Sequence, residues 1–101
     1  MTLYSENITM EKPIIEIEYC TKCRWLARAS WMAQELLSTF SNEIGGITLI
    51  PSSIAGIFEI RCGREIIWER GKKKGMPEIK ALKQKVRDII APDKDLGHID
   101  S

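Results

Sequence analysis

The sequence predicts one α/β domain with the element order β-α-β-β-β-α, a four-stranded mixed sheet and two helices. Segments with a residue period of two alternate with segments of helical period, and the length of 101 residues suits a single core. The right-handed crossover rule makes the first two strands parallel. We predict the domain over residues 13–92, between a flexible N-terminal extension (1–12) and a C-terminal tail (93–101).

The first half of the chain contains two strands and one helix in this prediction. Residues 13–19 (PIIEIEY) alternate apolar and acidic side chains, which is typical of a half-buried strand. A short strand at residues 47–50 is expected to stop at Pro51, which cannot donate a ladder hydrogen bond. Between them, from about residue 23 to residue 40, apolar residues recur at helical steps: Leu26, Ala29, Ala33, Leu36, Leu37 and Phe40.

The second half contains a hairpin and a second helix in this prediction. Residues 56–62 and 65–69 flank Gly63-Arg64, a connection whose leading glycine suits a type II′ turn. Pro77 is expected at the first position of the helix, which ends before Pro92. Its apolar stripe comprises Ile79, Leu82, Val86, Ile89 and Ile90. Both helices are needed to cover the faces of the sheet.

Charge and hydropathy narrow the classes of partner. A formal net charge of +1 gives no global attraction for nucleic acid, although most lysines and arginines lie between Arg61 and Arg87 and predict a basic face. Apolar stretches fall far short of the roughly 18 residues of a bilayer span, and the N-terminus lacks an apolar signal core. We therefore expect a cytoplasmic protein with neither nucleic acid nor membrane as a partner; the sequence does not specify an oligomeric state.

Cys20 and Cys23 form a Cys-Thr-Lys-Cys motif where the first strand ends and the first helix begins. Intracellular thiols are normally kept reduced, so a close pair there is more often catalytic or metal-binding than structural. The amides and partial positive charge of a helix N-terminus stabilise a thiolate, and Lys22, Arg24 and Arg28 add positive charge nearby. The spacing lets one sulfur resolve a mixed disulfide formed by the other. We predict Cys20 and Cys23 as catalytic redox residues.

Two alternatives compete with this interpretation: the cysteines could be unreactive packing residues, or half of a zinc site. Zinc would need Cys62 and His98, the only other soft ligands in the chain. Structural zinc sites usually supply their ligands as two spaced pairs, whereas each of these residues stands alone. We therefore expect no bound metal and no cofactor.

Four other features have a functional and an ordinary interpretation. Cys62 is a third redox thiol or, more commonly for a lone strand cysteine, a small packing residue. Trp25 and Trp31 form a contact surface or are partly buried. The run 72–74 is an anion- or protein-docking loop or simply a solvated one, and it lacks the P-loop pattern. His98 is a proton donor only if the tail folds over the cysteines.

The chain resembles the selenoprotein W-related, Rdx-type family from about residue 14 to residue 98, as an all-cysteine, bacterial-like member. The resemblance lies in IEIEYCTKCRWLARASWMAQELLSTF, GIFEI, GREIIWERGKKKGMPEIKALKQKVRDII and LGH, in that order. It implies a thioredoxin-like α/β fold and thiol-disulfide or peroxide-linked chemistry. Glutathione is the partner that the resemblance implies, and it does not supply a substrate. From the redox pair we expect thiol or disulfide protein substrates.

The order of attack stays open at this stage. In the animal selenoproteins that this chain resembles, selenocysteine stands at the position of Cys23, which implies that Cys23 attacks. The geometry of thioredoxin-like sites instead favours Cys20 as the exposed attacker and Cys23 as the more buried resolver. Ordinary thioredoxins also place a cis-proline before the strand that faces the site; here Ile54-Ala55-Gly56 occupies that approach, and Pro51 lies too early to be assumed equivalent.

Two functional hypotheses follow. The first is a thiol-disulfide redox protein in which one cysteine of the pair attacks an oxidised sulfur or a peroxide and the other releases it. The alternative is a redox-responsive protein-binding module without multiple turnover, in which oxidation of the pair alters a surface formed by Trp25, Trp31 and the basic loop.

Overall fold

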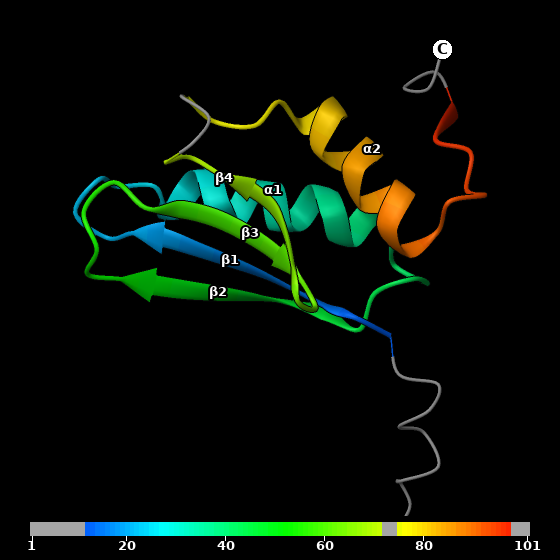
Figure 1. Cartoon of the computed structure of the whole chain (residues 1–101), viewed down its shortest axis with the longest axis horizontal. Helices are drawn as coiled ribbons and strands as arrows, with labels where there is room; N and C mark the ends of the chain where they lie inside the picture. The colour runs from blue at the N-terminus through cyan, green and yellow to red at the C-terminus, as the bar shows by residue number, and fades with distance from the viewer. Residues whose placement is uncertain (1–11, 72–74, 98–101) are drawn as a thin grey trace, which may run out of the picture.

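The computed structural model describes residues 12–71 and 75–97, which form one mixed sheet and two helices (Figure 1). The elements are β1 (Ile14–Cys20), α1 (Leu26–Thr39), β2 (Gly46–Ser52), β3 (Phe58–Cys62), β4 (Glu65–Glu69) and α2 (Ile79–Ile90). The strand order is β2-β1-β3-β4, with β1 parallel to β2 and the other two pairs antiparallel. This confirms the predicted element order and the thioredoxin-like arrangement.

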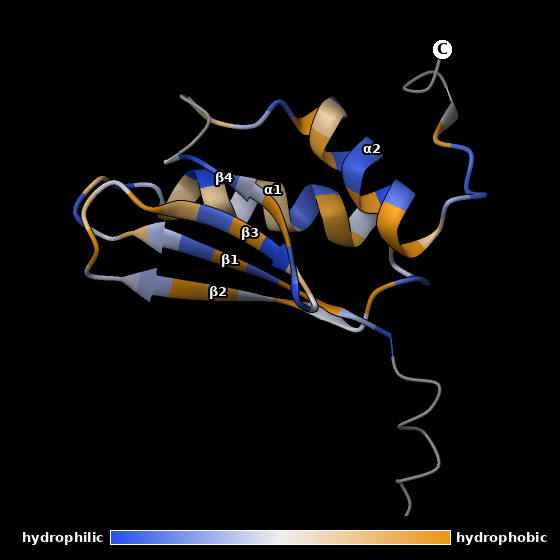
Figure 2. Ribbon diagram, in the orientation of Figure 1, coloured by the Kyte–Doolittle hydropathy of each residue, from blue (hydrophilic) through white to orange (hydrophobic). Residues whose placement is uncertain are grey.

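Both helices pack against the same face of the sheet. Ile15 and Ile17 of β1, Leu36 of α1, and Leu82 and Val86 of α2 are buried in a single core cluster. Hydrophobic and hydrophilic residues alternate along β1 and β3 in Figure 2, so the strands send their apolar side chains towards the helices. The helices therefore cover one face of the sheet and leave the other uncovered by either helix.

The uncovered face carries a cluster of charges around Arg61. The Arg61 guanidinium lies 3.0 Å from a Glu16 oxygen, 3.1 Å from a Glu18 oxygen and 2.8 Å from a Glu59 oxygen. Because the alternation along β1 places its two glutamates on the side opposite the core, the sequence contained the signal for a solvated face.

The ends of several elements differ from the predictions: β1 is displaced by one residue, β3 begins at Phe58 rather than at residue 56, and α1, β2 and α2 differ as follows. Helix α1 begins at Leu26, not near residue 23, with Trp25 as an N-cap that makes no side-chain capping bond. Strand β2 continues through Pro51 to Ser52; an edge strand pairs on one side only, so it tolerates a proline. Helix α2 begins at Ile79 because Glu78 is extended, which leaves Pro77 outside the first turn.

The hairpin prediction is confirmed: Cys62 pairs with Glu65 across Gly63-Arg64, and Gly63 has φ +61°, as the first residue of a type II′ turn requires. Three residues predicted on the apolar stripes are instead exposed: Leu26, Leu37 and Ile89. In the first helix Met32 is buried instead.

The chain after α2 returns to the core. The Lys94 ammonium lies 3.1 Å from a Glu43 carboxylate oxygen, and Arg87 donates a hydrogen bond to the Lys94 carbonyl. Leu96 is partly buried and packs against the core cluster. Within residues 12–71 and 75–97, neither helix is long and apolar enough to cross a bilayer.

Candidate functional site

The two predicted cysteines lie together at the carboxyl end of β1. Cys20 is the last residue of that strand, and Cys23 lies in the turn that leads towards α1. The Cys20 amide donates to the Ile57 carbonyl at 2.9 Å, and the Thr21 amide donates to the Ser52 carbonyl at 3.2 Å. These bonds tie the motif to the end of β2 and to the loop before β3, so both flanking connections position the cysteines.

The relative exposure of the two cysteines is the reverse of the sequence-based expectation. Cys20 is 1% exposed, whereas Cys23 is half-buried. Cys20 ends a central strand and is bonded to the loop before β3, and α1 starts only three residues after Cys23. Cys23 is therefore in a turn near the surface rather than one turn inside a helix.

A hydrogen bond between the Cys23 thiol and the Cys20 sulfur shifts the pKa values of the two cysteines in opposite directions. The Cys23 thiol donates to Cys20, and this bond is the main cause of a lowered Cys20 pKa; amides of Gly56, Cys23 and Lys22 act in the same direction against burial. The same bond is the main cause of a raised Cys23 pKa, assisted by burial. The proton of the half-ionised pair therefore resides mainly on Cys23.

The amides around Cys20 do not come from the first turn of α1, as the motif suggested. They come from the Cys-Thr-Lys-Cys turn itself and from Gly56 on the opposing loop. Gly56 has φ +76°, a left-handed conformation that suits glycine. The sequence analysis placed Ile54-Ala55-Gly56 before the strand that faces the site, but it assigned Gly56 no role in the chemistry of the cysteines.

Arg70 is a second residue that the sequence analysis missed. Its guanidinium carbon lies 5.0 Å from the centroid of the Trp25 ring, and Trp25 meets Phe58 edge to face at 5.9 Å. The positive charge of Arg70 opposes the rise in the Cys23 pKa. Trp25 is thus partly buried between two side chains, one of the two outcomes anticipated for it.

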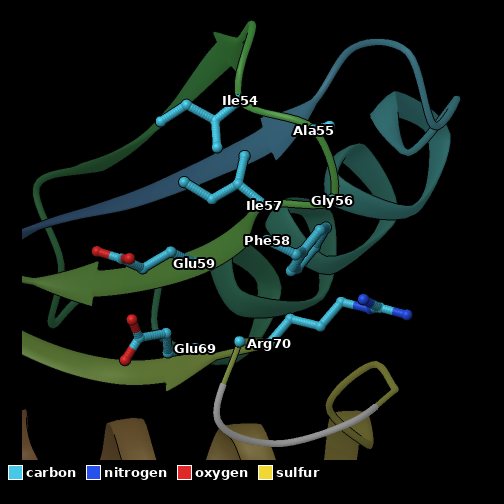
Figure 3. A pocket seen from close by; sticks show the side chains of 9 residues that line it. Ile54, Ala55, Gly56, Ile57, Phe58, Glu59, Glu69 and Arg70 are labelled. Carbon is cyan, nitrogen blue, oxygen red and sulfur yellow. The ribbon is translucent and has the colours of Figure 1, made fainter.

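A groove of about 230 Å³ lies where β3 begins and β4 ends. Its walls are the segment 54–59 and the segment 69–71 (Figure 3). Figure 3 shows Phe58 and Arg70 pointing to one side of this groove, and Glu59 and Glu69 pointing to the other. Because Gly56 lines the groove and its amide acts on both cysteines, the groove adjoins the thiol pair.

The remaining candidate residues are not gathered at this site. Cys62 pairs with Ile15, about 17 Å along β1 from Cys20, and its burial is the main cause of its raised pKa. Trp31 is 47% exposed on α1. His98 and residues 72–74 lie outside the described residues. Among the residues that are described, no three His, Cys, Asp or Glu side chains form a group that could hold a metal ion.

This arrangement is suited to cycling between a dithiol and a disulfide. One sulfur has a lowered pKa, the other is nearer to solvent, and the two are within hydrogen-bond reach. A thiolate is the reactive form in disulfide exchange, and a neighbouring thiol allows a mixed disulfide to be released intramolecularly.

Comparison with known proteins gives consistent results. A family model described as the Rdx family matches residues 14–88. A crystal structure of a Bordetella parapertussis protein is 49% identical, with a TM-score of 0.76 over 79% of this chain and 100% of that one. A selenoprotein W-related protein from Vibrio cholerae is 51% identical, with a TM-score of 0.75 over 78% of this chain and 98% of its own. No protein with curated function gives a match.

Proposed function

This chain belongs to the Rdx family, and we propose that it is a thiol-disulfide oxidoreductase that transfers two electrons from the Cys20–Cys23 dithiol to a disulfide substrate. One observation supports this proposal above the others. The more acidic sulfur, Cys20, accepts a hydrogen bond from the more exposed one, Cys23, at the end of a strand. A pair of packing cysteines needs neither the shared proton nor the unequal exposure.

Cys23 meets the substrate in this mechanism. The buried Cys20 thiolate accepts the Cys23 proton while the Cys23 sulfur attacks one sulfur of the substrate disulfide. The substrate S–S bond breaks, a new bond joins Cys23 to one half, and the other half leaves as a thiolate that takes a proton from water. Exposure thus supports the order of attack that the resemblance to selenoproteins implies.

Cys20 resolves the mixed disulfide. Its thiol loses a proton to solvent, aided by the amides of Gly56, Cys23 and Lys22 that favour the Cys20 thiolate, and its sulfur attacks the Cys23 sulfur. The second half of the substrate leaves as a thiolate, and the protein holds a Cys20–Cys23 disulfide. Two equivalents of a low-molecular-weight thiol, with glutathione as our proposed donor, restore the dithiol and become one disulfide. A compartment with a reducing thiol pool, such as the cytosol, suits this cycle.

The test is turnover of 2-hydroxyethyl disulfide by the full chain, with glutathione as donor and NADPH consumption by glutathione reductase as readout. We expect multiple turnovers with the wild type and with Cys62→Ala, because Cys62 is remote from the pair. Cys20→Ser should accumulate a mixed disulfide at Cys23, visible by mass spectrometry, whereas Cys23→Ser should not. Residual monothiol exchange in Cys20→Ser should be slower than in the wild type.

Two results would contradict the proposal. Reversible oxidation of the pair with neither glutathione-dependent nor dithiol-dependent turnover of any disulfide, or of hydrogen peroxide, would favour the redox-responsive binding module. Trapping of substrate by Cys23→Ser, and not by Cys20→Ser, would make Cys20 the attacking sulfur and reverse the assigned roles.

A further inference from the structure

Arg70 is held in place at the groove beside the cysteines. Its amide donates to the Phe58 carbonyl at 3.0 Å, and its guanidinium lies over the face of Trp25 at 5.0 Å. Trp25 is in turn fixed by its edge-to-face contact with Phe58. A guanidinium that stacks on an aromatic ring keeps its in-plane donors available, so stacking orients Arg70 without satisfying it.

The charge of Arg70 has no carboxylate partner in the part of the chain that the structure describes. Arg61, by comparison, pairs with Glu16, Glu18 and Glu59. The Nε atom of Arg70 is also shielded from solvent and has no hydrogen-bond acceptor among the described residues. The shielded Nε–H is out of a ligand's reach, but the terminal nitrogens of the guanidinium are not among the shielded atoms and have no counterion among the described residues, which favours a ligand that brings a negative charge to them.

The position of Arg70 relates it to the reacting sulfur. Arg70 and Gly56 line the same groove, and the Gly56 amide acts on both cysteines. The charge of Arg70 also reaches Cys23, the sulfur that meets the substrate in the mechanism above. The two carboxylates of the groove, Glu59 and Glu69, point to its other side in Figure 3, and Glu59 is paired with Arg61.

We propose that Arg70 is a specificity-determining residue that binds a carboxylate of the substrate, so that the site prefers small disulfides carrying a carboxylate a few bonds from the S–S bond. This inference rests on the proposed function, because it names the class of disulfide that the oxidoreductase accepts. The guanidinium offers two parallel N–H donors, the geometry that a carboxylate matches. Trp25 and Phe58 are positioning residues for Arg70.

The experiment compares three disulfides of similar length and different charge: 3,3′-dithiodipropionate (anionic), 2-hydroxyethyl disulfide (neutral) and cystamine (cationic). Rate constants for oxidation of the reduced full chain are measured at low ionic strength. We expect the wild type to react fastest with dithiodipropionate. In Arg70→Gln the rate ratio of dithiodipropionate to 2-hydroxyethyl disulfide should fall about tenfold, as expected for losing one opposite charge about 6 Å away in a partly solvated site.

The neutral disulfide separates substrate binding from a general effect on the thiols. Arg70 also favours the ionised form of Cys23, so Arg70→Gln is expected to slow all three reactions somewhat, and only the ratio reports recognition of the carboxylate. Arg70→Lys should show a rate ratio of dithiodipropionate to 2-hydroxyethyl disulfide between those of Arg70→Gln and the wild type, because lysine keeps the charge but not the paired donors. The ratio should also fall as salt is added.

Arg64→Gln is the matched control, since it removes one positive charge from the exposed hairpin at the other end of β3. It should leave the ratio unchanged. An equal fall in Arg64→Gln would assign the preference to net charge, and an unchanged ratio in Arg70→Gln would overturn the role of Arg70. Either result leaves the oxidoreductase intact, whereas failure of all three disulfides to oxidise the wild type would contradict the proposed function itself.

Discussion

Gly56 links backbone conformation to thiol chemistry at this site. A Cβ built on Gly56 would meet no atom within 4 Å, so space does not require a glycine there. The requirement comes from φ +76°, a conformation that L-residues with a side chain rarely adopt. In that conformation the Gly56 amide is directed at Cys20 and Cys23.

Gly56→Ala should therefore change both stability and acidity. We expect a loss of about 1–2 kcal/mol in the free energy of unfolding, the usual cost of a left-handed residue with a side chain. The strained loop is also expected to draw its amide away from Cys20, which raises the Cys20 pKa. Because the pKa of Cys20 is lowered in the fold, thiolate reactivity persists below the ordinary cysteine pKa and disappears as pH falls through the folded value. In Gly56→Ala the thiolate reactivity should therefore disappear at a higher pH than in the wild type.

The measurement is thiolate absorbance against pH in a Cys62→Ala background, where Cys20 and Cys23 are the only thiols of the chain. Gly63→Ala is the control: it has a similar φ of +61° and open space, but lies in the distant hairpin. It should destabilise the protein to a similar degree without shifting the titration. A titration that moves equally in both variants would show that the Gly56 amide has no specific role.

At the residue scale, the sequence identified the groups whose interaction is local and missed those that arrive by folding. Cys20 and Cys23 are three residues apart, so their spacing alone indicated a pair. Gly56 and Arg70 are far from them in the chain and come near them only because β3 pairs with β1 and β4 pairs with β3. The exposure of the pair was also predicted wrongly, because burial at a strand end depends on the loop that covers it.

At the scale of elements, periodicity identified every helix and strand of the described chain but not all of their ends. The two-residue period of β1 and the helical period of α1 and α2 are properties of many residues together. The start of α1 depends on a few residues without a capping side chain, and the end of β2 depends on its place at the sheet edge. Because the position of a strand at the edge of a sheet is a tertiary property, the prediction that β2 stops at Pro51 was wrong.

The uncovered face of the sheet provides the element-scale prediction. Arg61→Gln should lower the free energy of unfolding by about 1–3 kcal/mol, because three carboxylates on β1 and β3 lose their shared cation. The hydrogen bond to Glu59 is the main cause of a raised Arg61 pKa. The ion pairs therefore stabilise the fold below the ordinary arginine pKa, down to the acidic range in which carboxylates become protonated. The loss should therefore be constant from about pH 6 to pH 9.

Chemical denaturation at low and high salt is the appropriate measurement. The Arg61 side chain is 23% exposed, so the difference between wild type and Arg61→Gln should shrink as salt screens the pairs. Arg64→Gln, on the exposed hairpin, should cost less than about 0.5 kcal/mol. If Arg61→Gln and Arg64→Gln lower the free energy of unfolding equally, the three ion pairs contribute no more to stability than an isolated surface charge does.

At the scale of the whole molecule, the element order, the parallel pairing of the first two strands and the hairpin followed from the sequence through the crossover and hairpin rules, whereas the strand order β2-β1-β3-β4 was not predicted. The sequence did not indicate that the segment after α2 packs against the rest of the domain. Lys94 pairs with Glu43, which lies 51 positions earlier in the chain, and Leu96 packs against the core cluster. Such a segment has no periodic pattern in the sequence, which is why the predicted C-terminal tail begins at residue 93.

Leu96→Ala tests whether this segment belongs to the cooperative fold. Leu96 is partly buried against the core, so its truncation should cost about 1 kcal/mol, which corresponds to a fall of about 4–8 °C in the midpoint of thermal unfolding for a domain of this size. Leu37→Ala, which truncates an exposed leucine on α1, should shift the midpoint by less. The segment would be a loosely held tail if Leu96→Ala left the midpoint unchanged. A fall in the midpoint clearly larger than that of Leu37→Ala, in a single transition, would instead place residues 93–97 inside the folded unit, because shortening a side chain destabilises the fold in this way only when that side chain is packed in the native state.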